Sequence, residues 1–132
     1  MPCKSILVVD DDANVRNSLA AILSQAGYRV VTAGIVCDAI DSLVSNCFDL
    51  VLLDLKLPDM GGLALLSNLN IVYPRLPVMI LTGYSTADYL DEAERCGARG
   101  YFLKPIDPAL LLECVREVIS ESGALQNDTP IH

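Results

Sequence analysis

Residues 50–54 read Leu50-Val51-Leu52-Leu53-Asp54, four consecutive apolar side chains that end in a carboxylate. A short apolar run without polar alternation is typical of a strand that is covered on both faces of its sheet. A carboxylate at the end of such a strand borders the core, where it is costly without a partner. We therefore expect a sheet between two layers of helices and a functional role for Asp54.

Four further segments predict strands, which gives a set of five: Ser5–Val9, Tyr28–Ala33, Leu50–Asp54, Val78–Thr82 and Tyr101–Lys104. The segments between and after them predict helices from apolar residues at helical spacing: Val15–Ala26, Val36–Cys47, Leu65–Val72, Thr86–Cys96 and a helix from Pro108, which Asp107 caps. Strict alternation with short connections implies right-handed crossovers and a parallel sheet. The sequence predicts a three-layer (βα)5 doubly wound α/β domain with strand order 2-1-3-4-5, in which Tyr28–Ala33 is an edge strand.

Composition limits the classes of protein to which the chain can belong. We expect one domain over residues 1–120, followed by a tail or the start of a linker at residues 121–132, where helical periodicity is lost. No apolar run approaches the ~20 residues of a membrane helix, and no secretory leader is recognisable, so a cytoplasmic location is expected. The net charge of −8 argues against direct binding of nucleic acid.

The five cysteines stand far apart and form no C-x-x-C pair. Three of them fall on apolar positions of the predicted helices. We interpret them as small core residues and not as a metal or redox set.

Ionisable and hydroxyl side chains follow four of the five predicted strands: Asp10-Asp11-Asp12, Asp54, Thr82 and Lys104. Parallel sheets of this class bind ligands beyond the carboxyl ends of their strands, so these side chains should converge. Asp12 is the natural N-cap of the first helix, which leaves Asp10, Asp11 and Asp54 as a crowded acidic group. A hard divalent cation such as Mg²⁺ would turn their repulsion into a binding site.

The same group predicts a chemical reaction. A carboxylate can attack phosphorus and form an aspartyl-phosphate. The phosphoryl oxygens then need positive charge and hydrogen-bond donors, which Mg²⁺, the Lys104 ammonium and the Thr82 hydroxyl would supply. Lys104 precedes Pro105, where the peptide bond is a candidate for the cis form.

Over residues 4–120 the chain resembles the receiver domains of response regulators in two-component signalling. Four segments carry the resemblance, in order: SILVVDDD (5–12), DLVLLDLKLPDMGGLALL (49–66), PVMILTGYS (77–85) and GARGYFLKPI (97–106). The resemblance implies that Asp54 accepts the phosphoryl group. It implies that Asp11 binds Mg²⁺ or Mn²⁺ directly, that Asp10 acts mainly through water, and that the Lys56 carbonyl is a further ligand. It assigns switching or phosphate-binding roles to Thr82, Tyr101 and Lys104.

The resemblance also implies partners. The phosphodonor would be a sensor histidine kinase, a phosphotransfer protein or a small phosphorylated molecule. The surface made by the fourth helix, the fifth strand and the fifth helix would change on phosphorylation and serve for dimerisation or effector binding. Through a missing output domain or a partner it would control transcription. We further expect the bulky Lys56 and Tyr84 to shield the phosphoryl group from water and lengthen its life. Gly61 departs from the common pattern of the family without touching a site residue, and Gly83 follows Thr82 where alanine is common.

Three other functions use a similar fold. A haloacid-dehalogenase-type phosphohydrolase needs a second carboxylate two residues after its nucleophile, and here that residue is Lys56. A flavodoxin-like FMN binder needs a hydroxyl- and glycine-rich phosphate loop after the first strand, where Asp10-Asp11-Asp12 would repel phosphate. A receiver-like interaction module that is never phosphorylated remains the main alternative, and the complete set of acidic, threonine and lysine residues argues against it.

Overall fold

A computed structural model of the protein describes residues 3–56, 62–83 and 87–128. Five strands form one sheet: β1 (Ser5–Val9), β2 (Arg29–Ala33), β3 (Leu50–Asp54), β4 (Val78–Thr82) and β5 (Gly100–Leu103). Five helices alternate with them: α1 (Ala13–Gln25), α2 (Val36–Ser45), α3 (Gly62–Val72), α4 (Ala87–Arg95) and α5 (Pro108–Asp128). The predicted bounds of β1, β3 and β4 are confirmed. β2 begins one residue later than expected, and β5 lies one residue earlier.

All strand pairs are parallel, and the order β2-β1-β3-β4-β5 is the one that the sequence predicts. β3 is central and entirely buried, whereas β2 and β5 form the two edges. The carboxyl ends of the strands therefore lie at one edge of the sheet, and Asp54 is the last residue of its central strand.

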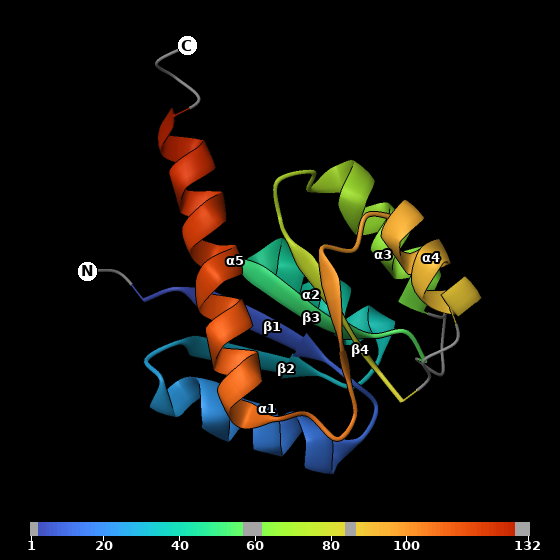
Figure 1. Ribbon diagram of the computed structural model, residues 1–132, viewed down its shortest axis with the longest axis horizontal. Helices are drawn as coiled ribbons and strands as arrows, with labels where there is room; N and C mark the ends of the chain where they lie inside the picture. Colours follow the sequence, from blue (N-terminus) through green and yellow to red (C-terminus); the bar gives the residue numbers. More distant parts are fainter. Residues whose placement is uncertain (1–2, 57–61, 84–86, 129–132) are drawn as a thin grey trace.

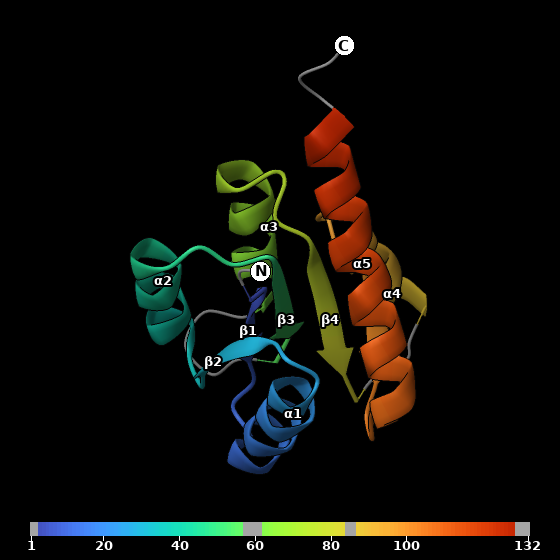
Figure 2. The same ribbon diagram turned by 90° about the vertical axis from the view of Figure 1, so that its left-hand side faces the viewer.

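Alternation along each strand sends side chains into two separate cores. Leu7 and Leu53 face α2, α3 and α4, whereas Ile6 and Leu52 face α1 and α5. Figures 1 and 2 show the resulting three layers, with α1 and α5 on one face of the sheet and the other helices on the opposite face. Burial on both faces explains why these strands are continuously apolar.

Helix ends follow the predicted signals. The Asp12 carboxylate accepts a hydrogen bond from the N–H of Asn14 and caps α1, and Gly27 follows that helix with a φ of +99°. The Asp107 carboxylate accepts from the N–H of Ala109 at 3.1 Å, and α5 begins at Pro108. This last helix continues to Asp128, beyond the point at which its apolar periodicity stops.

Some of the apolar residues whose spacing predicted the helices are not buried. In α2 the buried side chains are Val36, Ala39 and Leu43, whereas Ile40 and Val44 are 41% and 77% exposed. Val72 at the end of α3 is also exposed. The cysteines do not fill the core either, because three are exposed and two are half-buried at its margin: Cys3, Cys37, Cys47, Cys96 and Cys114.

Candidate functional site

Asp10 follows β1 and is completely buried, at 0% exposure. Its N–H donates to the Ala33 carbonyl at 3.0 Å, which extends the pairing of β1 with β2 by one residue. Its Oδ1 atom accepts from the N–H of Asp12 at 2.9 Å. The turn into α1 therefore fixes both the backbone and the carboxylate of Asp10.

Asp54 is 5% exposed and lies beside Leu81 of β4 in the sheet. Its Oδ1 atom accepts from the N–H of Lys56 at 2.9 Å. This bond closes a turn directly after the strand and aims the carboxylate away from the core. Asp10 and Asp54 thus each form an Asx-turn, in which the carboxylate accepts a hydrogen bond from the backbone N–H two residues further along.

Lys104 connects these two carboxylates. Its Nζ atom lies 2.7 Å from Asp10 Oδ2 and 3.1 Å from Asp54 Oδ2, and its side chain is 25% exposed. Burial alone would lower the pKa of Lys104, but the hydrogen bonds and charges of the two carboxylates raise it above its usual value. The ammonium therefore remains protonated and supplies the positive charge of the site. The Lys104–Pro105 peptide bond before α5 is cis.

The surroundings of Asp10 raise the pKa of its carboxyl. Desolvation raises the pKa of its carboxyl, and the Asp54 charge adds to this effect, although Lys104 and the N–H of Asp12 lower it. Its Oδ2 atom is buried, and the Lys104 ammonium lies 2.7 Å from it. The buried Asp10 carboxylate therefore depends on Lys104 for its counter-charge.

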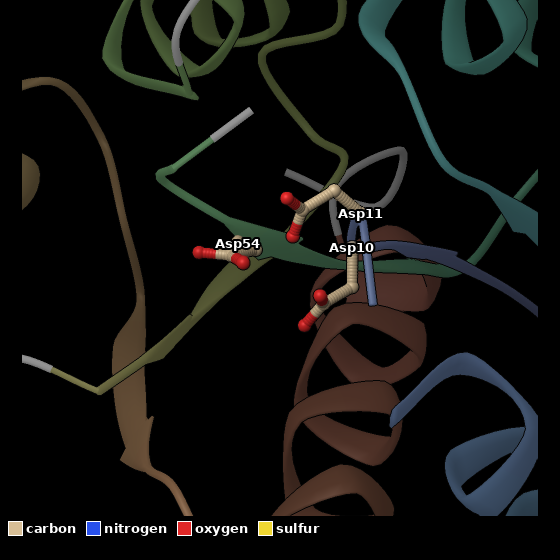
Figure 3. A group of neighbouring side chains, drawn as sticks. All are labelled: Asp10, Asp11 and Asp54. Atoms are coloured by element: carbon tan, nitrogen blue, oxygen red, sulfur yellow. The ribbon is translucent and has the colours of Figure 1, made fainter. Parts of the chain in front are cut away.

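The three carboxylates among the predicted metal ligands come together. Asp10, Asp11 and Asp54 each offer a carboxylate oxygen, and these oxygens all lie within 4.8 Å of one another. Figure 3 shows the carboxylates of the two residues after β1 and of the last residue of β3 around a common space. Oxygen donors at this separation suit Mg²⁺, which accepts one or two carboxylates and keeps several waters. The donor set therefore fits the metal that the sequence predicts, and the Lys56 carbonyl remains a predicted ligand.

Thr82 and Tyr101 lie on β4 and β5, on the side of β3 that is away from β1. Thr82 ends β4 at 2% exposure, and its carbonyl accepts from the N–H of Lys104 at 2.8 Å. The Tyr101 side chain on edge strand β5 is 50% exposed, so it is not fixed as a buried packing residue. It lines a groove of about 400 Å³ together with Leu90 and Ala93 of α4. Tyr84, which we expect near this site, lies outside the described residues, as does Gly61.

One side chain that the sequence did not single out also reaches this region. Arg16 on α1 donates a hydrogen bond from its Nη1 atom to the Asp10 carbonyl at 2.7 Å. The signal that could have identified it is its position, one turn after the N-cap Asp12, because helical side chains tilt toward the N-terminus.

Comparisons with known proteins show the family to which the chain belongs. The family model described as "Response regulator receiver domain" matches residues 6–116. Sporulation initiation phosphotransferase F of Bacillus subtilis (strain 168) is 31% identical over 116 residues, which are 88% of this chain and 94% of that protein. Transcriptional regulatory protein ZraR of Escherichia coli (strain K12) is 34% identical over 125 residues, or 95% of this chain but only 28% of the regulator.

A solved structure shows the same fold. The CheY-like receiver domain protein from Methanospirillum hungatei JF-1 matches with a TM-score of 0.89 and 33% identity, over 93% of this chain and 98% of its own. The chain belongs to the family of response regulator receiver domains, which act as phosphoacceptors in two-component signalling. It spans 28% of the length of the E. coli transcriptional regulator that it resembles. Among the described residues no helix is long and apolar enough to cross a membrane.

Proposed function

We propose that Asp54 is the residue that accepts the phosphoryl group. The observation that carries this assignment is the pairing of its Oδ2 atom with Lys104 at 3.1 Å, beside the acidic group and at the open edge of the sheet. Its Oδ1 atom accepts from the N–H of Lys56, which orients the carboxylate, and we assign the attack to Oδ2, from which Lys104 must turn to the incoming phosphoryl oxygen. Asp10 is the less accessible carboxylate, since it is completely buried.

The transfer is an in-line displacement. The Asp54 oxygen attacks phosphorus, and the bond from phosphorus to the imidazole nitrogen of a phosphohistidine breaks. The electron pair of that bond stays on the nitrogen, which the donor protein reprotonates. The Lys104 ammonium, now held between Asp10 and Asp54, then neutralises a phosphoryl oxygen, and the Thr82 hydroxyl donates to another.

Mg²⁺, or Mn²⁺ in its place, would be held by Asp10, Asp11, Asp54 and the Lys56 carbonyl. When bound, the cation would screen the carboxylates and neutralise the charge that develops on the phosphoryl oxygens. Asp11 is exposed and would be the most direct ligand, whereas buried Asp10 would act mainly through water. In this assignment the domain catalyses only its own phosphorylation and dephosphorylation.

Partners follow from the same chemistry. The phosphodonor is a sensor histidine kinase, a phosphotransfer protein or a small phosphodonor, and the domain acts in the cytoplasm. Phosphorylation would draw Thr82 toward the phosphoryl group and turn Tyr101 inward, which would alter the surface of α4, β5 and α5. That surface would serve for dimerisation or for an effector that controls transcription. The half-exposed Tyr101 beside its groove supports this proposal, and the net charge of −8 disfavours direct contact with nucleic acid.

Mass spectrometry after incubation with acetyl phosphate and Mg²⁺ tests the acceptor. The wild-type domain should gain one phosphoryl group that hydroxylamine removes, and Asp54→Ala should gain none. Asp49→Ala is the matched control, because Asp49 precedes the same strand at the opposite edge of the sheet and accepts from the N–H of Ser5. Full labelling of Asp54→Ala would reject the assignment. No labelling of the wild-type protein by any phosphodonor would instead favour the unphosphorylated interaction module.

A further inference from the structure

Arg16 is placed to control the geometry of the acidic group without belonging to it. The residue lies one turn after the cap of α1, its side chain is half-buried, and its guanidinium reaches back to the Asp10 carbonyl at 2.7 Å. A hydrogen bond from a charged donor to a carbonyl is shorter and stronger than a neutral one. Arg16 therefore holds a specific peptide plane, which is the one between Asp10 and Asp11.

This peptide joins two of the three carboxylates among the predicted metal ligands. The N–H of Asp10 bonds to the Ala33 carbonyl at 3.0 Å, and the Asp10 carboxylate bonds to the N–H of Asp12 at 2.9 Å. With the N–H groups of Asp10 and Asp12 both bonded, the Arg16 contact restrains the peptide from which the Asp11 side chain extends toward Asp54. The guanidinium also places positive charge near the carboxylates while it donates to a backbone oxygen, so it does not occupy a ligand atom.

Gly34 provides the space for this guanidinium. A Cβ atom added at Gly34, directly after β2, would lie 2.9 Å from Arg16 Nη1 and 3.4 Å from Cζ. Gly34 is not among the glycines with positive φ, so its backbone does not itself require glycine. The conflict is with the mobile end of a long side chain, so alanine there should displace the guanidinium and leave the fold intact.

From these contacts we infer that Arg16 is a positioning residue of the acidic site, and that Gly34 acts by seating its guanidinium. This inference builds on the proposed function, because it concerns the group of carboxylates that would hold the cation. It assigns a role in the site to β2, the strand whose end contributes no ionisable group.

Isothermal titration with Mg²⁺ tests the inference on the whole domain in five forms: wild type, Arg16→Ala, Arg16→Lys, Gly34→Ala and Arg16→Ala with Gly34→Ala. Residues that orient metal ligands typically contribute tenfold or more to affinity, so Arg16→Ala should weaken Mg²⁺ binding about tenfold. Arg16→Lys should recover part of the loss. Gly34→Ala should weaken binding in the same direction, and in the double variant it should add nothing, since no guanidinium remains to be displaced.

A matched control separates position from charge. Arg29 is an exposed arginine at the start of β2, at the opposite edge of the sheet, and Arg29→Ala changes the net charge equally. It should bind Mg²⁺ like the wild type. A second readout is the amide resonance of Asp11 in the metal-free domain, which belongs to the peptide that Arg16 holds and should shift in Arg16→Ala and Gly34→Ala.

Each outcome decides between distinct conclusions. Wild-type Mg²⁺ affinity in Arg16→Ala, together with lower resistance to urea, would make Arg16 a purely structural residue and overturn the inference. Additive losses in the double variant would show that Gly34 does not act through Arg16. Absence of Mg²⁺ binding in the wild-type domain would reject the metal site itself, and the inference with it, which is a different result from unaltered affinity in the variants.

Discussion

Replacement of Lys104 by methionine removes the only positive charge that the described residues place between Asp10 and Asp54. The substitution keeps the length and apolar stem of the side chain. It leaves two carboxylates that are 0% and 5% exposed without a counter-charge, in addition to their mutual repulsion. We therefore expect the metal-free Lys104→Met domain to be substantially less stable than the wild type.

The distances set the scale of this loss. At separations of 2.7 and 3.1 Å, each attraction amounts to about 5–6 kcal/mol at an effective dielectric of ~20, and desolvation of the ammonium offsets much of it. Loss of one partner from a buried pair costs about 3–5 kcal/mol. Because a quarter of the Lys104 side chain is exposed, we expect the lower end, about 3 kcal/mol, or a Tm lowered by about 10 °C.

Equilibrium unfolding in urea, followed by circular dichroism in EDTA and in excess Mg²⁺, measures this effect. The loss should shrink in Mg²⁺, because a cation bound to the carboxylates replaces part of the missing charge. Lys4→Met is the control, since Lys4 lies 4.0 Å from Asp49 in an exposed pair of the kind that contributes less than about 1 kcal/mol. Equal stability of Lys104→Met and Lys4→Met in EDTA would refute the reasoning.

Three other results are expected. In a urea titration, Gly62→Ala should lower the free energy of unfolding by about 3 kcal/mol or more, because its Cβ would lie 2.3 Å from the Leu55 backbone. Gly83→Ala is the control and should unfold like the wild type, because a Cβ there meets open space. Lys56→Ala should speed phosphate loss from the labelled domain if its side chain shields the acyl phosphate, and an unchanged rate would remove Lys56 from that role. In Thr82→Ala, beryllofluoride should still bind, but the amide shifts that it causes across residues 83–104 should shrink sharply; undiminished shifts would show that Thr82 is not the coupling residue.

The sequence was most informative where burial is complete. The strands β1, β3 and β4 have their predicted bounds because both faces of each are covered, which requires unbroken apolar runs. On the surface helix α2 the same kind of argument failed. Its apolar residues span more than one stripe, and the small Ala39 faces the sheet while Val44 faces outward. Apolar residues at helical spacing indicate that a helix has an apolar face, but tertiary packing decides which of its residues are buried.

Part of the candidate site could be predicted from the sequence and part could not. Convergence of Asp10, Asp11 and Asp54 was predictable, because the strand order alone brings the carboxyl ends of β1 and β3 together. Lys104 was also expected at this edge, but its direct pairing with both Asp10 and Asp54 was not predicted, because strand order does not fix where a long side chain ends. The position of the Arg16 guanidinium in the space beside Gly34 was also not predictable, because it depends on how far a helical side chain reaches toward the end of an edge strand.

The two flanks of the acidic group differ in how firmly they are held, and this difference favours one direction for a signal. On the β2 side, Asp10 is tied to Ala33 by its backbone and to Arg16 by its carbonyl, so a change in charge at Asp54 has little to move there. On the other side, β5 is a four-residue edge strand in which only Phe102 is buried, and Tyr101 is half exposed. Local stability is lowest where few apolar contacts hold an element. A negative charge added at Asp54 should therefore act through Lys104, which already pairs with that carboxylate, and displace β5 and its neighbour α4 before it disturbs β1 or β2.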